Sequence, residues 1–351
     1  MRVLHLAAGN RWTGAAAPAF AEVEALREAG VDAHYAYVGG YKLEAKIGHH
    51  DFAHPLIEKA QNPLSFLRSL DAIDRVIRRH GFDVLHAHLT YDHWLARLVA
   101  RDHDVRIART FHARRVLRGD PFTRALLART ERFFVVNDEL RDAPALHGKH
   151  VVFTPPPIDH RQFTPDGGDV RAQYGIPAEA KLVTVIGKLS RHRGFEEALR
   201  TFAAIRPRVP TARMMVIGHG EHRPALESLA ATLGIADHVT WAGYHEEDLA
   251  AHYRASDLLL FTARGSDEGH RAILEAMACG VPPAAFPLEG VAALLGPLSS
   301  ACAAPAATPE VLAATAVALL ERAAPPLRRA AYERSLEFSY ARAAERLLAA
   351  Y

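Results

Sequence analysis

The sequence of 351 residues contains little cysteine: Cys279 and Cys302 are its two cysteines. Two cysteines cannot build a disulfide framework, and they are too few for a four-cysteine zinc site. The class of small disulfide-dependent secreted domains is therefore excluded. We expect a protein that folds in a reducing compartment, the cytoplasm.

The sequence also lacks an apolar run long enough to span a membrane. A transmembrane helix needs about 20 apolar residues, and three prolines interrupt the richest candidate, residues 276–288. Residues 1–9 carry one basic residue and too short an apolar segment for a signal peptide. We expect a soluble protein in which residues 1–9 form a first buried strand and a glycine loop.

Charge of one sign is not in excess over the whole chain. Lys and Arg total 42 against 40 for Asp and Glu, which leaves a net charge of +2. This balance excludes nucleic-acid binding through bulk positive charge. A local exception is Arg97–Arg132, which has ten arginines and four acidic residues. We interpret this region as a solvated or acceptor-facing surface, or as a patch that contacts anionic lipids at the inner face of the membrane.

What the sequence does contain is a regular alternation of strand and helix patterns. Such alternation requires crossover connections, which indicate parallel sheets covered by helices on both faces. Strands are predicted at residues 3–8, 32–38, 84–88, 106–112, 133–137, 151–154, 182–186, 214–217, 239–242 and 258–262. Helices are predicted at residues 18–28, 64–79, 94–101, 196–205, 223–233, 248–254, 272–279 and 340–351.

A stretch rich in proline and glycine, residues 154–175, divides this pattern into two halves. We therefore predict an α/β protein with two doubly wound, Rossmann-like parallel-sheet domains, 1–160 and 161–336, that face each other across a cleft. A C-terminal helix, 337–351, follows them. Ligands of such sheets bind at the carboxyl ends of the strands, where loops enter helices.

Two acidic residues flank the start of a predicted helix in the second half. A strand ends at Thr262, a polar loop containing Asp267 follows, and a helix that carries Glu275 begins near His270. The free N–H groups and partial positive charge of a helix N-terminus suit phosphate or sugar oxygens. Without further context, the two acids would be a helix cap and an ordinary helical glutamate.

The adjoining run Leu274–Pro282, LEAMACGVP, resembles the signature helix of glycosyltransferase family 4, whose members have the GT-B fold. The family pattern has two acidic residues separated by seven positions, and Asp267 and Glu275 have this spacing, with Asp267 in place of the usual glutamate. The resemblance implies that Glu275 binds ribose hydroxyls and that Asp267 contacts the transferred sugar. The donor-binding residues implied in this segment are Asp267, Gly269, His270, Arg271 and Glu275.

The resemblance extends to three earlier segments. Val185–Gly194 resembles a strand and loop that carry two basic residues for the donor diphosphate, here Lys188 and Arg193. Two such cations stabilise the charge that grows on the leaving group. Val216–Glu221 matches a strand with a Gly-x-Gly turn, and Val239–Tyr244 matches the strand and loop that pass the nucleotide base. These segments add Gly187, Gly218 and Tyr244 to the implied donor-binding residues.

The N-terminal half is the acceptor-binding part in this family. Phe338–Leu348 resembles the family's C-terminal helix that crosses back to this half, so we expect the helix 337–351 to pack on the first domain. His112 ends the predicted strand 106–112, where the family places an active-site histidine beside the reacting sugar. Gly14 stands at the entrance to the first helix, where the absence of a Cβ lets the backbone approach the donor phosphate. The implied catalytic set is His112, Asp267, Lys188 and Arg193, and the acceptor-side candidates are Trp12, Thr13 and His88.

His86 and His88 have the spacing that places both rings on one face of a strand, as a metal pair would need. A third ligand cannot be assigned from the sequence, and the family needs no metal. We therefore interpret one of the two as a core histidine, and His88 as directed toward the cleft. The expected cofactor set is empty, and no metal is expected.

These features predict a retaining, metal-independent glycosyltransferase. It would move a hexose or related sugar from a nucleotide-diphosphate sugar to a hydroxyl acceptor, in the synthesis of cell-envelope polysaccharide or a glycoconjugate. A catalytically silent GT-B protein that binds sugar nucleotides or a partner is the alternative. A Rossmann dehydrogenase is disfavoured because the loop Gly9–Gly14 does not supply Gly-x-Gly-x-x-Gly.

Overall fold

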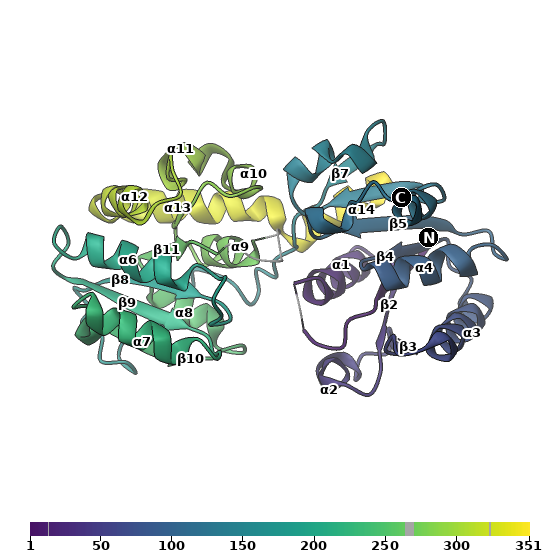
Figure 1. Cartoon of the computed structure of the whole chain (residues 1–351), viewed down its shortest axis with the longest axis horizontal. Coiled ribbons are helices and arrows are strands. Elements are labelled where there is room, and N and C mark those ends of the chain that lie inside the picture. Colours follow the sequence, from purple (N-terminus) through teal and green to yellow (C-terminus); the bar gives the residue numbers. More distant parts are fainter. Residues whose placement is uncertain (13, 264–269, 323) are drawn as a thin grey trace. The chain divides into compact units, whose positions relative to one another are not determined.

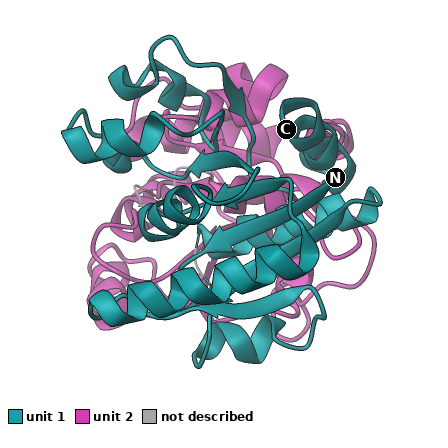
Figure 2. Cartoon of the chain, turned by 90° about the vertical axis from the view of Figure 1, so that its right-hand side faces the viewer, with its two compact units in different colours: residues 1–157, 266–269, 338–351 teal, residues 158–265, 270–337 magenta. Residues whose placement is uncertain are grey.

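The structure, a computed structural model, describes residues 1–12, 14–263, 270–322 and 324–351 (Figure 1). The chain divides into two compact units, which Figure 2 shows in different colours. Among the described residues, unit 1 contains 1–157 and 338–351, and unit 2 contains 158–263 and 270–337. In the described residues, no helix combines the length and the apolar character needed to cross a bilayer.

The strands of unit 1 form a parallel sheet in the order β3-β2-β1-β4-β5-β6-β7. The strands are β1 (Arg2–Ala7), β2 (Asp32–Val38), β3 (Ala53–Ile57), β4 (Val84–Ala87), β5 (Arg106–Phe111), β6 (Arg132–Val135) and β7 (Val151–Phe153). The helices are α1 (Ala16–Glu28), α2 (Lys42–Ile47), α3 (Pro63–His80), α4 (Thr90–Val99), α5 (Pro121–Leu127) and α14 (Tyr340–Ala350), with 3-10 turns at Arg114–Val116, Asp138–Asp142 and Pro144–Leu146.

Alternation along β1 separates the two faces of this sheet. Val3 and Ala7 pack in one core cluster with residues of α1 and α14, whereas Leu4 and Leu6 pack in another with residues of α3 and α4. His5 belongs to the first face because side chains of a strand alternate. The polar residues placed on this face therefore meet α1 and α14 rather than solvent.

The C-terminal helix α14 packs on α1 within unit 1. Ala343 and Ala344 form a small buried cluster with Ala25 of α1, and the Tyr340 hydroxyl donates to the Glu24 carboxylate across 2.8 Å. The predicted return of the C-terminal helix to the first domain is therefore confirmed.

Unit 2 contains a second parallel sheet, in the order β10-β9-β8-β11-β12. Its strands are β8 (Lys181–Ile186), β9 (Ala212–Ile217), β10 (Val239–Gly243), β11 (Leu258–Phe261) and β12 (Pro283–Ala285). Its helices are α6 (Phe195–Ile205), α7 (Arg223–Thr232), α8 (Leu249–Ala255), α9 (Arg271–Ala278), α10 (Val291–Leu295), α11 (Ser299–Cys302), α12 (Pro309–Glu321) and α13 (Ala324–Ser335), with 3-10 turns at Ala236–His238, Gly296–Leu298 and Leu336–Phe338. The predicted pair of doubly wound parallel sheets is confirmed.

Two strands escape the sequence prediction, and both lie at sheet edges. β3 contains Pro55 and β12 begins at Pro283. Proline cannot donate to a β-ladder, so it is confined to edge strands, strand starts and bulges. Each strand is also short and shows little alternation of apolar and polar residues. Pairing with the neighbouring strand, rather than a pattern in its own sequence, therefore makes each of them a strand.

Candidate active site

The loops after β8, β9 and β11 are linked at the carboxyl edge of the unit 2 sheet. The Leu189 N–H donates to the His219 carbonyl across 3.0 Å, which joins the loop after β8 to the loop after β9. The Thr262 hydroxyl, at the end of β11, donates to the Gly194 carbonyl across 2.7 Å. The strand ends that carry three of the four predicted donor segments therefore meet at one edge of one sheet.

Gly187 and Gly218 allow the backbones of two of these loops to touch. Their φ angles are 149° and 138°, a region that L side chains rarely adopt. A Cβ on Gly218 would lie 1.8 Å from the carbonyl oxygen of Gly187. The Gly218 N–H also donates to the Gly243 carbonyl across 2.6 Å. These two predicted donor-binding glycines thus shape the loops that carry Lys188 and Tyr244.

We expect Gly218→Ala to lower the free energy of unfolding by about 3 kcal/mol or more, because it adds a steric clash to an unfavourable backbone conformation. The matched control is Gly234→Ala, whose φ is also positive at 69° but whose Cβ would have no neighbour within 4 Å. The control should cost only about 1–2 kcal/mol. Urea titrations with equal midpoints for the two variants would contradict this account of the loop.

Lys188 and Arg193 lie in the loop between β8 and α6. The Lys188 side chain is 62% exposed, and its ammonium is 3.9 Å from the Glu221 carboxylate. An exposed pair of this kind contributes about 0–1 kcal/mol and exchanges readily for another anion. Arg193 is half-buried, and no described residue forms an ion pair or hydrogen bond with its guanidinium. Both cations are therefore available to an anionic ligand.

Glu275 lies on α9 and is buried. Its carboxylate accepts a hydrogen bond from the Tyr253 hydroxyl at 3.0 Å and pairs with the Arg271 guanidinium at 2.7 Å. Burial raises the pKa of this carboxyl, and both partners counteract the rise by favouring its charged form. Sequence reasoning found Glu275 and Arg271 but missed Tyr253, because nothing in the local pattern of α8 points to α9.

His270 precedes α9 in a left-handed conformation, with φ of 45°. Its Nε2 lies 2.6 Å from the Glu289 carbonyl oxygen, and its ring packs edge-on against Phe261 of β11. A non-glycine residue in this region carries backbone strain, which is concentrated at functional sites in proteins. Asp267 and Gly269, the other predicted residues of this segment, lie outside the described residues.

Tyr244 follows β10 and is 59% exposed. Its hydroxyl donates to the Glu246 carboxylate across 2.8 Å, and its ring meets the His219 ring edge-on at 5.1 Å. His219 belongs to the loop that contacts Leu189. An exposed aromatic ring therefore stands beside the linked loops.

Trp12, a predicted residue of the first loop in unit 1, packs against α1 and α2. Its ring meets the Phe20 ring at 5.8 Å and carries the Lys46 ammonium over its face at 4.6 Å. Gly14 lies in the turn that leads into α1, and Thr13 lies outside the described residues. Trp12 thus anchors the loop to the core, with part of its ring exposed.

His112 follows β5 and belongs to a chain of buried histidines. Its Nε2 lies 3.2 Å from Nδ1 of His88, whereas its own Nδ1 is buried and has no hydrogen-bond partner among the described residues. Burial lowers the pKa of the His112 imidazole to about 3, so the ring is neutral near pH 7. His88 itself is 1% exposed, so any contact that it makes with a substrate passes through His112.

Asp92 and Arg109 are two buried ionisable residues that sequence reasoning missed, and each influences the pKa of the other. The Asp92 carboxylate accepts hydrogen bonds from the backbone N–H groups of Ala8, His88 and Leu89 at 3.2, 3.3 and 2.7 Å. Burial lowers the pKa of Arg109 to about 10, and the Asp92 charge opposes that shift. Asp92 thus ties the loop after β1 to the loop after β4. Its position three residues into α4 was the available signal, since a helix-capping acid often sits there.

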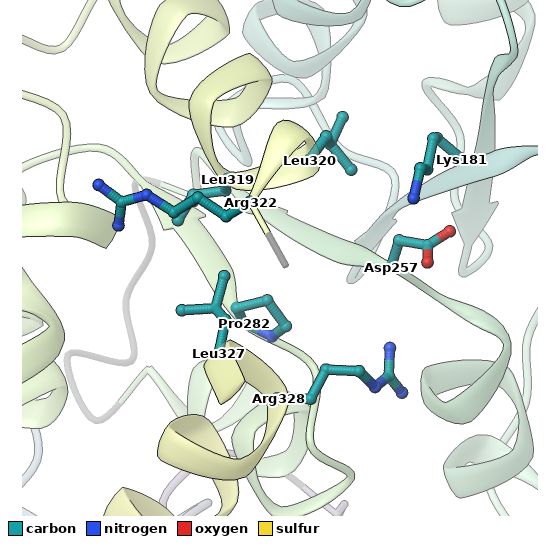
Figure 3. Close-up of a pocket in the computed structure, with 8 residues that line it drawn as sticks. All are labelled: Lys181, Asp257, Pro282, Leu319, Leu320, Arg322, Leu327 and Arg328. Carbon is teal, nitrogen blue, oxygen red and sulfur yellow. The ribbon is translucent and has the colours of Figure 1, made fainter. Parts of the chain in front are cut away.

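One pocket of unit 2 lies away from these loops (Figure 3). Its lining includes Lys181, which begins β8, and Asp257, which precedes β11, so it lies at the amino edge of the sheet. Asp257 accepts from the Leu182 N–H and pairs with Arg171, both at 2.8 Å. The Asp257 carboxylate in this pocket therefore stabilises the fold, and the pocket is not the candidate active site.

Solved structures show the same fold along almost the whole chain. A sucrose-phosphate synthase from Thermosynechococcus elongatus has a TM-score of 0.80 at 18% identity, covering 99% of this chain and 97% of that one. The Anabaena protein HepE in complex with UDP has a TM-score of 0.81 at 16% identity, covering 99% of both chains. Two doubly wound units with these neighbours define a protein of the GT-B fold.

Two family models together account for most of the chain. The model described as glycosyl transferases group 1 matches residues 168–337, and the model described as glycosyltransferase family 4 matches residues 12–162. The chain belongs to this glycosyltransferase family, and the resemblance noted in its sequence is confirmed.

Curated relatives match parts of the chain. A GDP-mannose-dependent alpha-(1-6)-phosphatidylinositol monomannoside mannosyltransferase of Mycolicibacterium smegmatis is 33% identical over 138 residues, which is 36% of each protein. A D-inositol 3-phosphate glycosyltransferase of the same organism is 28% identical over 295 residues, 77% of this chain and 67% of that relative. A mannosylfructose-phosphate synthase of Agrobacterium fabrum is 32% identical over 41% of this chain and 34% of its own length. The chain thus spans about a third of the length of two of these relatives.

Proposed function

We propose that this chain is a retaining glycosyltransferase. It transfers a hexose or related sugar from a nucleotide-diphosphate sugar to a hydroxyl acceptor, in the synthesis of cell-envelope polysaccharide or a glycoconjugate. Family membership supports the reaction class. The relatives named for GDP-mannose, and the HepE complexes with UDP and UDP-glucose, support a nucleotide-sugar donor.

The observation that carries this proposal is the cationic loop at the carboxyl edge of unit 2. Lys188 and Arg193 stand in a loop that Gly194 and Gly218 hold against its neighbours, and among the described residues neither cation has a strong protein partner. A donor diphosphate fits this arrangement because its negative charge increases when the glycosidic bond breaks. Cations held in place before the reaction stabilise that charge without reorganisation.

The remaining donor contacts follow from their places around the same edge. We assign the ribose hydroxyls to Glu275. A hydrogen bond from the ribose would take the place of the ion pair between Glu275 and Arg271, whose side chain is 32% exposed. Tyr244 would pack beside the base, and Gly187 and Gly218 would let the backbone approach the donor. Asp267, with Gly269 and His270, is assigned to the transferred sugar.

In unit 1, His112 is the group that we assign to the reacting sugar. A buried Nδ1 without a partner costs free energy unless a ligand satisfies it, so an oxygen of the substrate would complete this hydrogen bond. Gly14 is assigned to the donor phosphate, and Trp12 and Thr13 to the acceptor. His88 is assigned to the acceptor side through His112.

A thermal-shift panel of UDP-, GDP- and ADP-sugars tests the proposal. The preferred donor should raise the unfolding midpoint most, because a ligand of the folded state stabilises it by RT ln(1 + [L]/Kd). Arg193→Ala should reduce that shift, whereas Arg191→Ala, an exposed cation of the same loop, should not. A panel without any shift, together with no hydrolysis of any donor, would exclude the proposed activity.

We predict that the product keeps the anomeric configuration of an α-configured donor and forms without added divalent metal. An inverting enzyme needs a base on the face opposite the leaving group. The side chains assigned near the anomeric carbon are Lys188, Arg193 and neutral His112, with Asp267 assigned to sugar hydroxyls. These groups suit a charge-separated transition state on one face. Proton NMR of the anomeric signal, with EDTA in the assay, should show an α-linked product; a β-linked product would refute retention.

The Arg97–Arg132 region is proposed to contact anionic membrane lipids. Arg109 is buried and takes no part, but Arg118 and Arg124 are exposed and flank Phe122, which is 73% exposed at the start of α5. Arginine beside an exposed aromatic ring suits a membrane interface.

Binding to phosphatidylglycerol vesicles should therefore exceed binding to phosphatidylcholine vesicles, and should weaken with salt. Replacing Arg118 or Arg124 with alanine should each cost about fivefold in affinity, since one basic residue near an anionic surface contributes about 1 kcal/mol. Arg208→Ala, an exposed arginine of unit 2, is the control. Equal sedimentation with both vesicle types would contradict the prediction.

A further inference from the structure

Four ionisable residues of unit 1 meet near the carboxyl ends of β1 and β4, the two strands that pair at the centre of its sheet. His5 lies opposite His86 in the register of these strands, and His88 follows β4 on the same face. Glu22 on α1 faces them. His5 and His86 are 0% exposed, and Glu22 and His88 are 1% exposed. The cluster is therefore sealed from solvent within unit 1.

Three atoms of this cluster form a compact triangle. Nδ1 of His5 lies 2.9 Å from Nε2 of His88, and Oε2 of Glu22 lies 3.6 Å from the first and 3.7 Å from the second. A point in the plane of the triangle is about 2.0 Å from all three atoms, and Zn–N and Zn–O bonds are about 2.0–2.2 Å long. The triangle thus has the dimensions of a metal-ligand set.

The burial of the Glu22 carboxylate is not explained by hydrogen bonds within the described part of the protein. The contact between His5 and His88 alone would be an ordinary hydrogen bond, but the distances from Glu22 to both rings are too long for one. Its Oε2 is buried and has no hydrogen-bond partner among the described residues. Burial of an unpaired carboxylate costs several kcal/mol. A bound cation at the centre of the triangle would remove that cost.

A second group of histidines and acids among the described residues, His245, Asp248 and His252, differs from this cluster because its members are hydrogen-bonded. His245 bonds to the Asp248 carboxylate at 2.9 Å and to the Ala242 carbonyl at 3.0 Å, and His252 bonds to the Asp248 carbonyl at 3.1 Å. These groups satisfy one another without an ion. Asp248 is also half exposed, whereas Glu22 is enclosed. The unit 2 group therefore serves as a control.

We propose that His5, His88 and Glu22 bind a divalent transition-metal ion, zinc above all, in the core of unit 1. Two imidazoles and one carboxylate are ligands that zinc accepts. His86 also has a ligand atom within 4.8 Å of the other three, but its Nδ1 and Nε2 contact the hydroxyls of Tyr351 and Thr110 at 2.5 and 2.7 Å, so we leave it out of the ligand set. The site holds the fold; the donor side of the reaction, for which we predict no metal, is separate from it.

The second nitrogen of each ligand histidine already has the partner that a metal site requires. Nε2 of His5 lies 3.1 Å from the Tyr351 hydroxyl, and Nδ1 of His88 lies 3.2 Å from Nε2 of His112. Such outer contacts fix the tautomer and the ring orientation of a metal-bound histidine. A metal on Nε2 of His88 leaves the proton on Nδ1, which then donates to His112. The ion would thereby position His112 without touching substrate.

Metal analysis of the purified full-length chain, free of any affinity tag, tests the proposal. After reconstitution with Zn²⁺ and dialysis, the wild type should retain about one zinc per chain. Glu22→Gln and His88→Gln should each retain at least tenfold less, whereas His245→Gln should match the wild type. Zn²⁺ should also raise the unfolding midpoint of the metal-free wild type but not that of Glu22→Gln.

Cobalt substitution keeps the test decisive if the ligand variants fail to fold. Co²⁺ added to the metal-free wild type should give the intense visible d–d bands of a low-coordinate site, and Zn²⁺ should abolish them. A wild type that retains less than a tenth of an equivalent of zinc and gives no such bands overturns the proposal, as does unchanged zinc content in folded Glu22→Gln and His88→Gln. The EDTA in the short NMR product assay should not remove this ion, because an enclosed ion leaves only when unit 1 opens.

Discussion

Replacing Lys188 or Arg193 with alanine should lower turnover by about 10²–10³-fold, the typical loss when one group that stabilises transition-state charge is removed. The reason is that the diphosphate leaving group becomes more negative as the bond to the sugar breaks. The fold should remain intact, because Lys188 is 62% exposed and its ion pair with Glu221 spans 3.9 Å. Steady-state kinetics with the donor chosen by the thermal-shift panel would measure the effect.

The matched control is Arg191→Ala, which removes an exposed cation from the same loop and should keep nearly wild-type turnover. The double variant adds a further check. If both cations act on one diphosphate, the two losses should not simply add, because groups that act as a unit show non-additive effects. Near wild-type turnover in both single variants would remove the diphosphate assignment.

The fold could be predicted from the sequence because its central strands are long apolar runs and its helices begin and end at recognisable residues. Asn62 caps α3 through its side chain, and Gly81 ends the helix in a left-handed conformation. These local signals are independent of distant residues. The edge strands β3 and β12 have no comparable signal, because pairing with a neighbour, not composition, makes them strands.

The candidate donor site could be predicted for a similar reason. Lys188, Gly218 and Glu275 each belong to a short segment whose pattern is local, and parallel topology then brings the segments to one edge. The roles assigned to these residues are predictions. Tyr253, which bonds to Glu275, lies on another helix and carried no local signal.

The buried cluster of unit 1 could not be assembled from the sequence, because its members come from distant segments. The strand register sets His5 opposite His86, and register is a property of paired strands. One signal was present: Glu22 stands four residues before Leu26, on the apolar side of α1. A charged residue on an apolar face indicates a buried partner, and the structure identifies its neighbours as His5 and His88.

His112→Ala should lower turnover by about 10²-fold or more, while donor binding in unit 2 persists. In the described structure, Nδ1 of His112 is buried without a partner, and its ring is neutral because burial lowers the imidazole pKa to about 3. A neutral, desolvated hydrogen-bonding group is therefore ready for an oxygen of the substrate. The buried control is His93→Ala, whose Nε2 lies 2.8 Å from Thr130. This control should lose stability but little turnover per folded molecule.

The choice between asparagine and glutamine at position 112 separates a catalytic role from a packing role. An asparagine amide places a polar atom near the position of Nδ1, whereas a glutamine amide places one near Nε2, which faces His88 at 3.2 Å. If Nδ1 binds the substrate, His112→Asn should recover part of the turnover that His112→Ala loses, and His112→Gln should recover little. Both variants fill more of the space than alanine does, so a purely structural role predicts greater recovery with the longer glutamine. Turnover measured alongside unfolding midpoints decides between them, and recovery by glutamine alone would place the function of His112 in its contact with His88.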